Sequence, residues 1–225
     1  MATPATRRAP LGGSIELDFA IRGAAPVEFA AVPTLGFRLA IEHRGPEPIR
    51  SVVLDTQIQI AARRRSYGDA EQMRLMDLFG RPTGWSTALR TFPWLRTTQV
   101  VPAFTGATEL ELAVPCTYDF EVTAAKYLAA LESGEVPLEF LFSGTVFYTA
   151  EGGALQTAMI GWDREAEYRL PVRVWREVMD LYFPGSAWLR LDRDAFDRLY
   201  AYRARHVLPS WEHALDRLLD AAEEG

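Results

Sequence analysis

Two side chains of this 225-residue chain are candidate nucleophiles, because Cys116 is its only cysteine and Lys126 its only lysine. A thiol reacts when a base or a helix N-terminus lowers its pKa, and no histidine lies near Cys116 in the sequence. A lysine forms a Schiff base when a desolvated pocket lowers its pKa. The sequence therefore favours a buried small side chain for Cys116 and a surface charge for Lys126, with an enzyme centred on either as the less favoured alternative.

The densest basic point is the run Arg63, Arg64 and Arg65, at the end of a predicted strand. Strand alternation places Arg64 on the face of Ile60, with Arg63 and Arg65 on the opposite face. Two interpretations remain open for this run. It is either a solvated strand end that pairs with local acids, or a contact for a carboxylate-rich or phosphate-bearing partner.

Aromatic residues make up 12% of the chain and include six tryptophans. Most of them are expected in the core, but some lie in irregular segments or at the start of an element. Such tryptophans are candidate partner contacts, because aromatic side chains are enriched at binding interfaces. These candidates are Trp94, Trp188 and Trp211.

Several classes of function are excluded or disfavoured. The chain has no P-loop motif, no G-x-G-x-x-G turn and no G-x-S-x-G elbow, which argues against P-loop nucleotidases, Rossmann cofactor sites and α/β-hydrolases. One cysteine and three scattered histidines make a metal site improbable, so no metal and no other cofactor is expected. The net charge of −6 disfavours a nucleic-acid partner. No apolar run is long enough for a membrane span, and a cytoplasmic location is expected.

Hydrophobic residues alternate with polar ones over residues 15–21, 35–41 and 52–60, with turn signals between the runs. This period of two predicts an antiparallel sheet with one solvated face. Further strands are expected over residues 99–103, 108–114, 138–148 and 155–162, and Phe120 with Val122 extends the series. Gly144 interrupts the long strand and indicates a bulge or a close approach of two backbones.

Helical patterns are expected over residues 69–79 and 124–131, and in three segments after Pro171. The predicted fold class is α+β, an antiparallel β-sandwich-like core of about seven strands with a helical C-terminal segment. The predicted organisation is a flexible arm over residues 1–13, a β-rich core over 14–162 and a helical tail over 163–225. The tail is expected to pack on the core, so that both form one structural domain.

Several runs, which together span most of the chain after its first thirteen residues, carry a resemblance to a known family. They are VPTL (32–35), VPCTYDFEV (114–122), AAKY (124–127), GEVPL (134–138), LFSGTVF (141–147) and DLYFP (180–184). The chain resembles a bacterial domain-of-unknown-function family whose genes often lie among those for nickel–iron uptake hydrogenases. The resemblance implies a role in hydrogenase assembly or operation, with a hydrogenase subunit or a maturation factor as partner. It assigns no catalytic residue.

The function expected from these observations is that of a non-catalytic accessory protein that binds another protein. An exposed sheet edge can add a strand of a partner, and an aromatic groove can hold an apolar segment. The main alternative is a β-sandwich that binds a small ligand or a lipid in an aromatic cavity.

Overall fold

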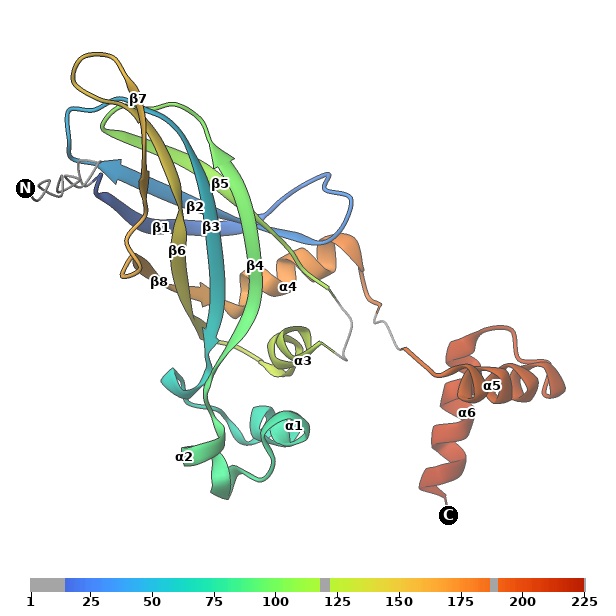
Figure 1. The fold of residues 1–225 in the computed structure, drawn as a ribbon. Helices are drawn as coiled ribbons and strands as arrows, with labels where there is room; N and C mark the ends of the chain where they lie inside the picture. Colours follow the sequence, from blue (N-terminus) through green and yellow to red (C-terminus); the bar gives the residue numbers. More distant parts are fainter. Residues whose placement is uncertain (1–14, 118–121, 187–189, 225) are drawn as a thin grey trace, which may run out of the picture. The chain divides into compact units, whose positions relative to one another are not determined.

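The computed structural model describes residues 15–117, 122–186 and 190–224. Residues Met1–Ala187 form one compact unit and residues Trp188–Gly225 form a second. The first unit contains both β-sheets and four helices, and the second contains two helices (Figure 1). The expected arm over residues 1–13 and the strand residue Phe120 lie outside the described residues.

The smaller sheet has three antiparallel strands in the order β1-β2-β5. They are β1 (Leu17–Pro26), β2 (Thr34–His43) and β5 (Ala107–Pro115). Leu35, Phe37, Leu39 and Ile41 of β2 are fully buried. The alternation in the sequence therefore identified the buried face of this sheet correctly.

The larger sheet has five antiparallel strands, in which β6 pairs with two different strands along one side. They are β4 (Thr91–Val101), β3 (Ile49–Ala61), β6 (Glu135–Thr149), β7 (Leu155–Met159) and β8 (Glu165–Pro171). Residues 145–149 of β6 pair with β7, and residues 135–141 pair with β8. A turn over residues 161–164, in which the Arg164 amide donates to the Gly161 carbonyl at 3.3 Å, separates β7 from β8.

The two sheets pack face to face through aromatic rings. Phe19 of β1 stacks on Phe142 of β6 at 4.3 Å between ring centroids, and Phe37 of β2 meets Phe140 of β6 edge-on at 5.2 Å. Within the described part of the chain there are eight strands in two antiparallel sheets and six α-helices. The α+β, antiparallel sandwich-like prediction is therefore confirmed.

At Gly144 the backbone of β6 lies close against the backbone of β3. Its φ is +140°, and a Cβ at this position would overlap the carbonyl oxygen of Val53. Only glycine fits both conditions without strain. The close approach predicted from the sequence is confirmed, and this position joins the two central strands of the larger sheet.

Three helices lie at one end of the sheets, where β3 ends and β6 begins (Figure 1). They are α1 (Asp69–Phe79), α2 (Trp85–Ala88) and α3 (Thr123–Ala130), with short 3₁₀ turns at Ala62–Arg64 and Pro82–Gly84. A fourth helix, α4 (Val172–Tyr182), follows β8 directly. The Tyr182 hydroxyl donates to the Val27 carbonyl and accepts from the Ala30 amide, both at 2.9 Å, so α4 holds the β1–β2 loop.

Three segments differ from the sequence-based expectation, and one of them is β7, which ends at Met159 rather than at Trp162 because the chain turns at Gly161. Strand β4 begins at Thr91 rather than at residue 99, because Pro93 lies on the edge of the sheet, where a missing backbone donor is tolerated. Residues 165–171 form β8 rather than helix, since Ala166, Tyr168 and Leu170 alternate with charged residues. Packing of residues 190–224 on the sheets stays a prediction.

The second unit is a pair of helices with well-defined starts. They are α5 (Arg193–Arg205) and α6 (Trp211–Glu223). The Asp192 carboxylate accepts from the Ala195 amide at 2.7 Å, and the Ser210 hydroxyl accepts from the His213 amide at 3.3 Å. Aspartate and serine are among the preferred N-cap residues, so both helices begin where their sequence favours a start.

Candidate functional site

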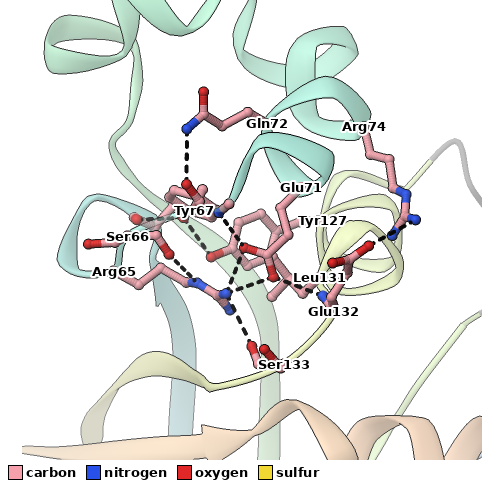
Figure 2. A network of polar contacts seen from close by, with 12 residues as sticks. Arg65, Ser66, Tyr67, Glu71, Gln72, Arg74, Tyr127, Leu131, Glu132 and Ser133 are labelled. Carbon is pink, nitrogen blue, oxygen red and sulfur yellow. Dashed lines mark hydrogen bonds and ion pairs between the residues drawn. The ribbon is translucent and has the colours of Figure 1, made fainter.

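A buried ion pair joins the end of β3 to helix α1 (Figure 2). Arg65 Nη2 lies 2.9 Å from both carboxylate oxygens of Glu71, and the two side chains are only 9% and 6% exposed. The same nitrogen donates to the Ser133 carbonyl at 3.2 Å. Arg65 Nη1 is buried and has no hydrogen-bond partner among the described residues, so the guanidinium depends on Glu71 for its charge compensation.

Glu71 also organises the backbone around it (Figure 2). Its Oε1 accepts from the Glu132 amide at 2.8 Å, and its Oε2 accepts from the Gly68 amide at the start of α1 at 3.3 Å. One carboxylate therefore connects the start of α1, the segment after α3 and the segment after β3. This arrangement orders the chain and leaves no free acid or base for catalysis within the pair.

Two tyrosines extend this network into the core. The Tyr67 hydroxyl donates to the Ala62 carbonyl at 2.6 Å and lies 2.8 Å from the Tyr127 hydroxyl, so Tyr127 is the donor between the two phenols. Burial raises the pKa of both tyrosines above the ordinary value. Both phenols therefore stay neutral at physiological pH, and neither acts as a phenolate base.

The arginine run does not follow strand alternation. The chain enters a 3₁₀ turn at Ala62–Arg64, so Arg65 points inward to Glu71 while Arg63 stays exposed. Arg64 Nη1 lies 2.7 Å from Glu167 and 3.3 Å from Glu139, in ion pairs open to solvent. The predicted opposition of Arg64 to Arg63 and Arg65 is therefore wrong. A role for the run in contacting a partner stays a prediction, with Arg63 and Arg64 as its accessible members.

Cys116 is buried, and its environment suppresses the chemistry of a thiolate. Burial raises the pKa of the Cys116 thiol to about 12, and its Sγ lies 3.5 Å from the Val114 carbonyl. It lines a cavity of about 140 Å³ together with Trp94, Leu95, Pro115, Thr117, Val122, Ala124, Ala125, Leu128 and Trp175. Among the residues that the structure describes, this lining contains no acid and no histidine. The volume is also below the roughly 300–1,000 Å³ that small-molecule sites occupy.

We expect Cys116 to resist alkylation by iodoacetamide in the native protein at neutral pH. With the thiol pKa near 12, the thiolate fraction is about 10³-fold below that of an ordinary cysteine. Burial slows the reaction further. Intact mass spectrometry over time measures the rate, and the unfolded chain, where Cys116 is accessible, serves as the control. Native and denatured rates that agree within threefold would contradict this account.

Lys126 connects two helices. Its ammonium group pairs with the Asp77 carboxylate, so α3 is tied to α1 at the surface. The side chain is about one-third exposed. This is the surface charge expected from the sequence, and it lies in an ion pair with Asp77 rather than in a desolvated pocket.

The two candidate tryptophans that the structure describes lie in different settings. Trp94 is half-buried and meets Phe37 edge-on at 6.4 Å, so it belongs to the wall of the core. Trp211 begins α6 and lies under the Arg203 guanidinium, 4.5 Å from the ring centroid. Trp188 lies outside the described residues. Contacts of these residues with a partner stay predictions.

Trp162 is 95% exposed, although the sequence places it at the end of a predicted strand and no motif distinguishes it. It lies in the turn between β7 and β8, next to Arg164, whose Nη1 is 3.2 Å from Asp18 of β1. The neighbouring Gly161 and Asp163 are the signal that could have identified a turn. An exposed tryptophan on an anchored turn is a good candidate for an interface anchor.

A groove of about 490 Å³ crosses the outer face of the three-stranded sheet, and small residues and the charges Arg38, Glu109 and Glu111 line it.

Within residues 15–117, 122–186 and 190–224, no three His, Cys, Asp or Glu side chains lie close enough to hold a metal ion. In the same residues, no helix is both long and apolar enough to cross a membrane.

Comparison with solved structures gives only distant similarities. The putative ApaA protein from Bordetella pertussis is 13% identical with a TM-score of 0.28, over 69% of this chain and 93% of that chain. The β-glucosidase 3B from Thermotoga neapolitana is 10% identical with a TM-score of 0.26, over 69% of this chain and 17% of that chain. The β-glucosidase from Kluyveromyces marxianus is 10% identical with a TM-score of 0.25, over 69% of this chain and 15% of that chain. These TM-scores are too low to carry any argument about function.

No curated protein matches the chain. A family model does match, and it covers residues 14–225, which is nearly the whole sequence. The chain belongs to the family of unknown function DUF6084.

Proposed function

We propose that this protein is a non-catalytic accessory protein that acts by binding another protein. The observation that carries the proposal is the helix pair α5–α6, which, taken by itself, leaves most of its apolar side chains uncovered. Of the residues described in this unit, only Ala214 is buried. Leu215, Leu218 and Leu219 of α6 are 38%, 38% and 60% exposed.

These leucines form one stripe, because residues three and four apart share a face of a helix. A unit of about 40 residues buries too little surface to be stable by itself, so an uncovered apolar stripe favours binding. The other residues of α6 include Glu212, Asp216, Asp220 and Glu223 against the single cation Arg217. The partner surface that fits is therefore apolar at its centre and basic at its rim.

The candidate reactive groups support a non-catalytic role. Cys116 is protonated at neutral pH, Lys126 pairs with Asp77, and the buried Arg65 and Glu71 compensate each other. A single cysteine and three histidines also give poor ligands for carrying nickel or iron, so a contribution through protein contacts is favoured over metal carriage.

The proposed setting is hydrogenase assembly or operation in the cytoplasm, with a hydrogenase subunit or a maturation factor as partner. The resemblance of the runs at residues 114–122 and 141–147 to a family encoded near hydrogenase genes supports this part of the proposal. The exposed leucines of α6 and the acidic residues on the same helix support binding to a protein, whichever protein that is.

The test is affinity purification with mass spectrometry from native cells in hydrogen-dependent growth. We expect the wild-type chain to recover a hydrogenase subunit or a maturation factor, and the double variant Leu215→Asp/Leu218→Asp to lose at least tenfold of that signal. A charge on an apolar stripe leaves a buried, uncompensated carboxylate in the complex. Arg217→Ala, on the opposite side of α6, is the matched control and should recover the partner normally.

Thermal unfolding of the same variants separates partner binding from packing within the chain. If the stripe binds a partner, the midpoint of unfolding of the purified double variant stays close to that of the wild type. If the stripe is covered by the sheets of its own chain, the midpoint falls by several degrees, since about 1 kcal/mol shifts it by ~2–4 °C in a domain of this size. A fall of several degrees in the unfolding midpoint of the double variant would contradict the proposal. Repeated purifications that recover no protein partner would also contradict it.

A further inference from the structure

Among the strands that the structure describes, β7 is an edge strand that lacks the usual protection against pairing. Edge strands commonly carry charges or proline, which keep other strands from adding to them. The other strands at the sheet edges follow this rule, whereas the sequence of β7 is LQTAM. The protecting residues are Asp18 and Arg22 in β1, Pro93 and Arg96 in β4, Glu109 and Glu111 in β5, and Glu165, Glu167 and Arg169 in β8.

The hydrogen bonds between β6 and β7 identify the backbone groups that face outward. The Ala150 amide donates to the Ala154 carbonyl at 2.9 Å, and the Ile160 amide donates to the Gly144 carbonyl at 3.0 Å. Pairing alternates along an antiparallel strand, so the even-numbered residues of β7 bond to β6. Leu155, Thr157 and Met159 therefore present their N–H and C=O groups to the open edge.

The side chains of the same three residues lie on the outer face of the sheet. Leu155 and Met159 are 65% and 71% exposed, and Thr157 lies between them opposite Phe147 of β6. The strand is thus symmetric about Thr157, with one large apolar side chain on each side. In an antiparallel pair of two such strands, a two-fold axis at the central residue places Thr157 opposite itself and each large apolar side chain opposite the other.

We propose that two copies of this chain associate through β7, antiparallel, with the two-fold axis at Thr157. Thr157 then lies opposite Thr157 of the second copy, and Leu155 lies opposite Met159. Three outward residues on each strand supply about six ladder hydrogen bonds. Threonine pairs and apolar pairs across strands are both favourable, so the side chains support the same register.

Charge explains both the choice of this edge and the expected strength of pairing. Each chain carries a net charge of −6, so two copies repel each other over most of their surfaces. Strand β7 itself carries no charge; the nearest acids in the sequence, Glu151 and Asp163, lie beyond its two ends, and Asp163 is 3.7 Å from Arg164. Salt screens the long-range repulsion, so the dimer should be tighter at high than at low ionic strength.

The first test is light scattering coupled to size exclusion, on the full chain at micromolar to submillimolar concentrations. We expect a mass that rises with concentration towards twice 25.2 kDa. Thr157→Pro should give a monomer, because it removes an outward N–H without breaking a bond to β6. Thr157→Val keeps that N–H and should dimerise as the wild type does. Circular dichroism verifies that Thr157→Pro is folded.

A second variant keeps the test decisive if Thr157→Pro unfolds. Met159→Lys leaves the backbone intact and places a cation in the proposed apolar pair, so it too should be monomeric at concentrations where the wild type dimerises. A wild-type chain that stays monomeric throughout would overturn the proposal. A dimer that survives Met159→Lys and a folded Thr157→Pro would also overturn it.

Crosslinking tests the register directly. Facing residues of a hydrogen-bonded antiparallel pair have Cα atoms about 5.5 Å apart, which suits a disulfide. Thr157→Cys should therefore form a covalent dimer on mild oxidation, since the native Cys116 is buried. Ser143→Cys, exposed on β6 away from the edge, is the control and should stay monomeric under non-reducing electrophoresis. Equal crosslinking of both variants would contradict the proposed axis.

Discussion

We expect Gly144→Ala to lower the free energy of unfolding by about 3 kcal/mol or more. The added Cβ would overlap the Val53 carbonyl oxygen, and a φ of +140° is strained for alanine. Strained backbone costs about 1–3 kcal/mol and overpacking about 1–3 kcal/mol, and here both apply at one atom. Because β3 and β6 are the central strands of the larger sheet, there is no loose neighbour that can move away.

Chemical denaturation measured by tryptophan fluorescence checks this prediction. Ser143→Ala is the matched control, since Ser143 is the adjacent residue on β6 and points to solvent. We expect the control to change the unfolding free energy by less than about 0.5 kcal/mol. If Gly144→Ala is as stable as Ser143→Ala, the close approach of β6 and β3 at this position is wrong.

Removal of Glu71 is expected to destabilise the protein by about 3–5 kcal/mol, because Glu71→Ala leaves the Arg65 guanidinium buried without a counter-charge. The variant also leaves the amides of Gly68 and Glu132 without their acceptor. Arg74→Ala is the matched control, since it breaks the exposed Arg74–Glu132 pair, 3.1 Å apart, and should cost less than about 1 kcal/mol. Equilibrium unfolding in urea measures both.

A double variant separates the charge of this pair from its shape. Arg65→Met/Glu71→Met removes both charges and keeps much of the volume, so it should be more stable than Glu71→Ala. The coupling between the two positions is expected to exceed about 1 kcal/mol in a double-mutant cycle. Additive effects of the two single substitutions would show that the ion pair does not connect α1 to β3 as described.

Most strands could be predicted from the sequence, because period-two alternation is a local signal. It identified β1, β2 and β3 along with the buried face of β2. Strand β8 shows the limit of this signal, since its alternation is short and runs directly into Val172 and helix α4. The sequence predicts a shorter β4, because a proline usually indicates the end of a strand. Pro93 is tolerated within β4 because this strand lies at the edge of the sheet, which the sequence does not show.

The polar network could not be predicted, because its contacts span long distances in the sequence. Nothing near Arg65 reveals that the Ser133 carbonyl and the Glu132 amide will meet around Glu71. The edge at Thr157 depends in the same way on the pairing of β6 with β7. Cys116 is a contrast, since its burial was expected from residue type alone and its raised pKa follows from that burial.

The Lys126–Asp77 pair has a practical consequence, because Lys126 is the only lysine in the chain. Apart from the amino terminus, an amine-directed dye can attach at this one position, and it must displace Asp77 to do so. Labelling kinetics at Lys126 therefore report how readily this surface ion pair opens. Lys126 is thus a single attachment site for a dye that would report on α1 and α3, at the opposite end of the sheets from the β6–β7 turn (Figure 1).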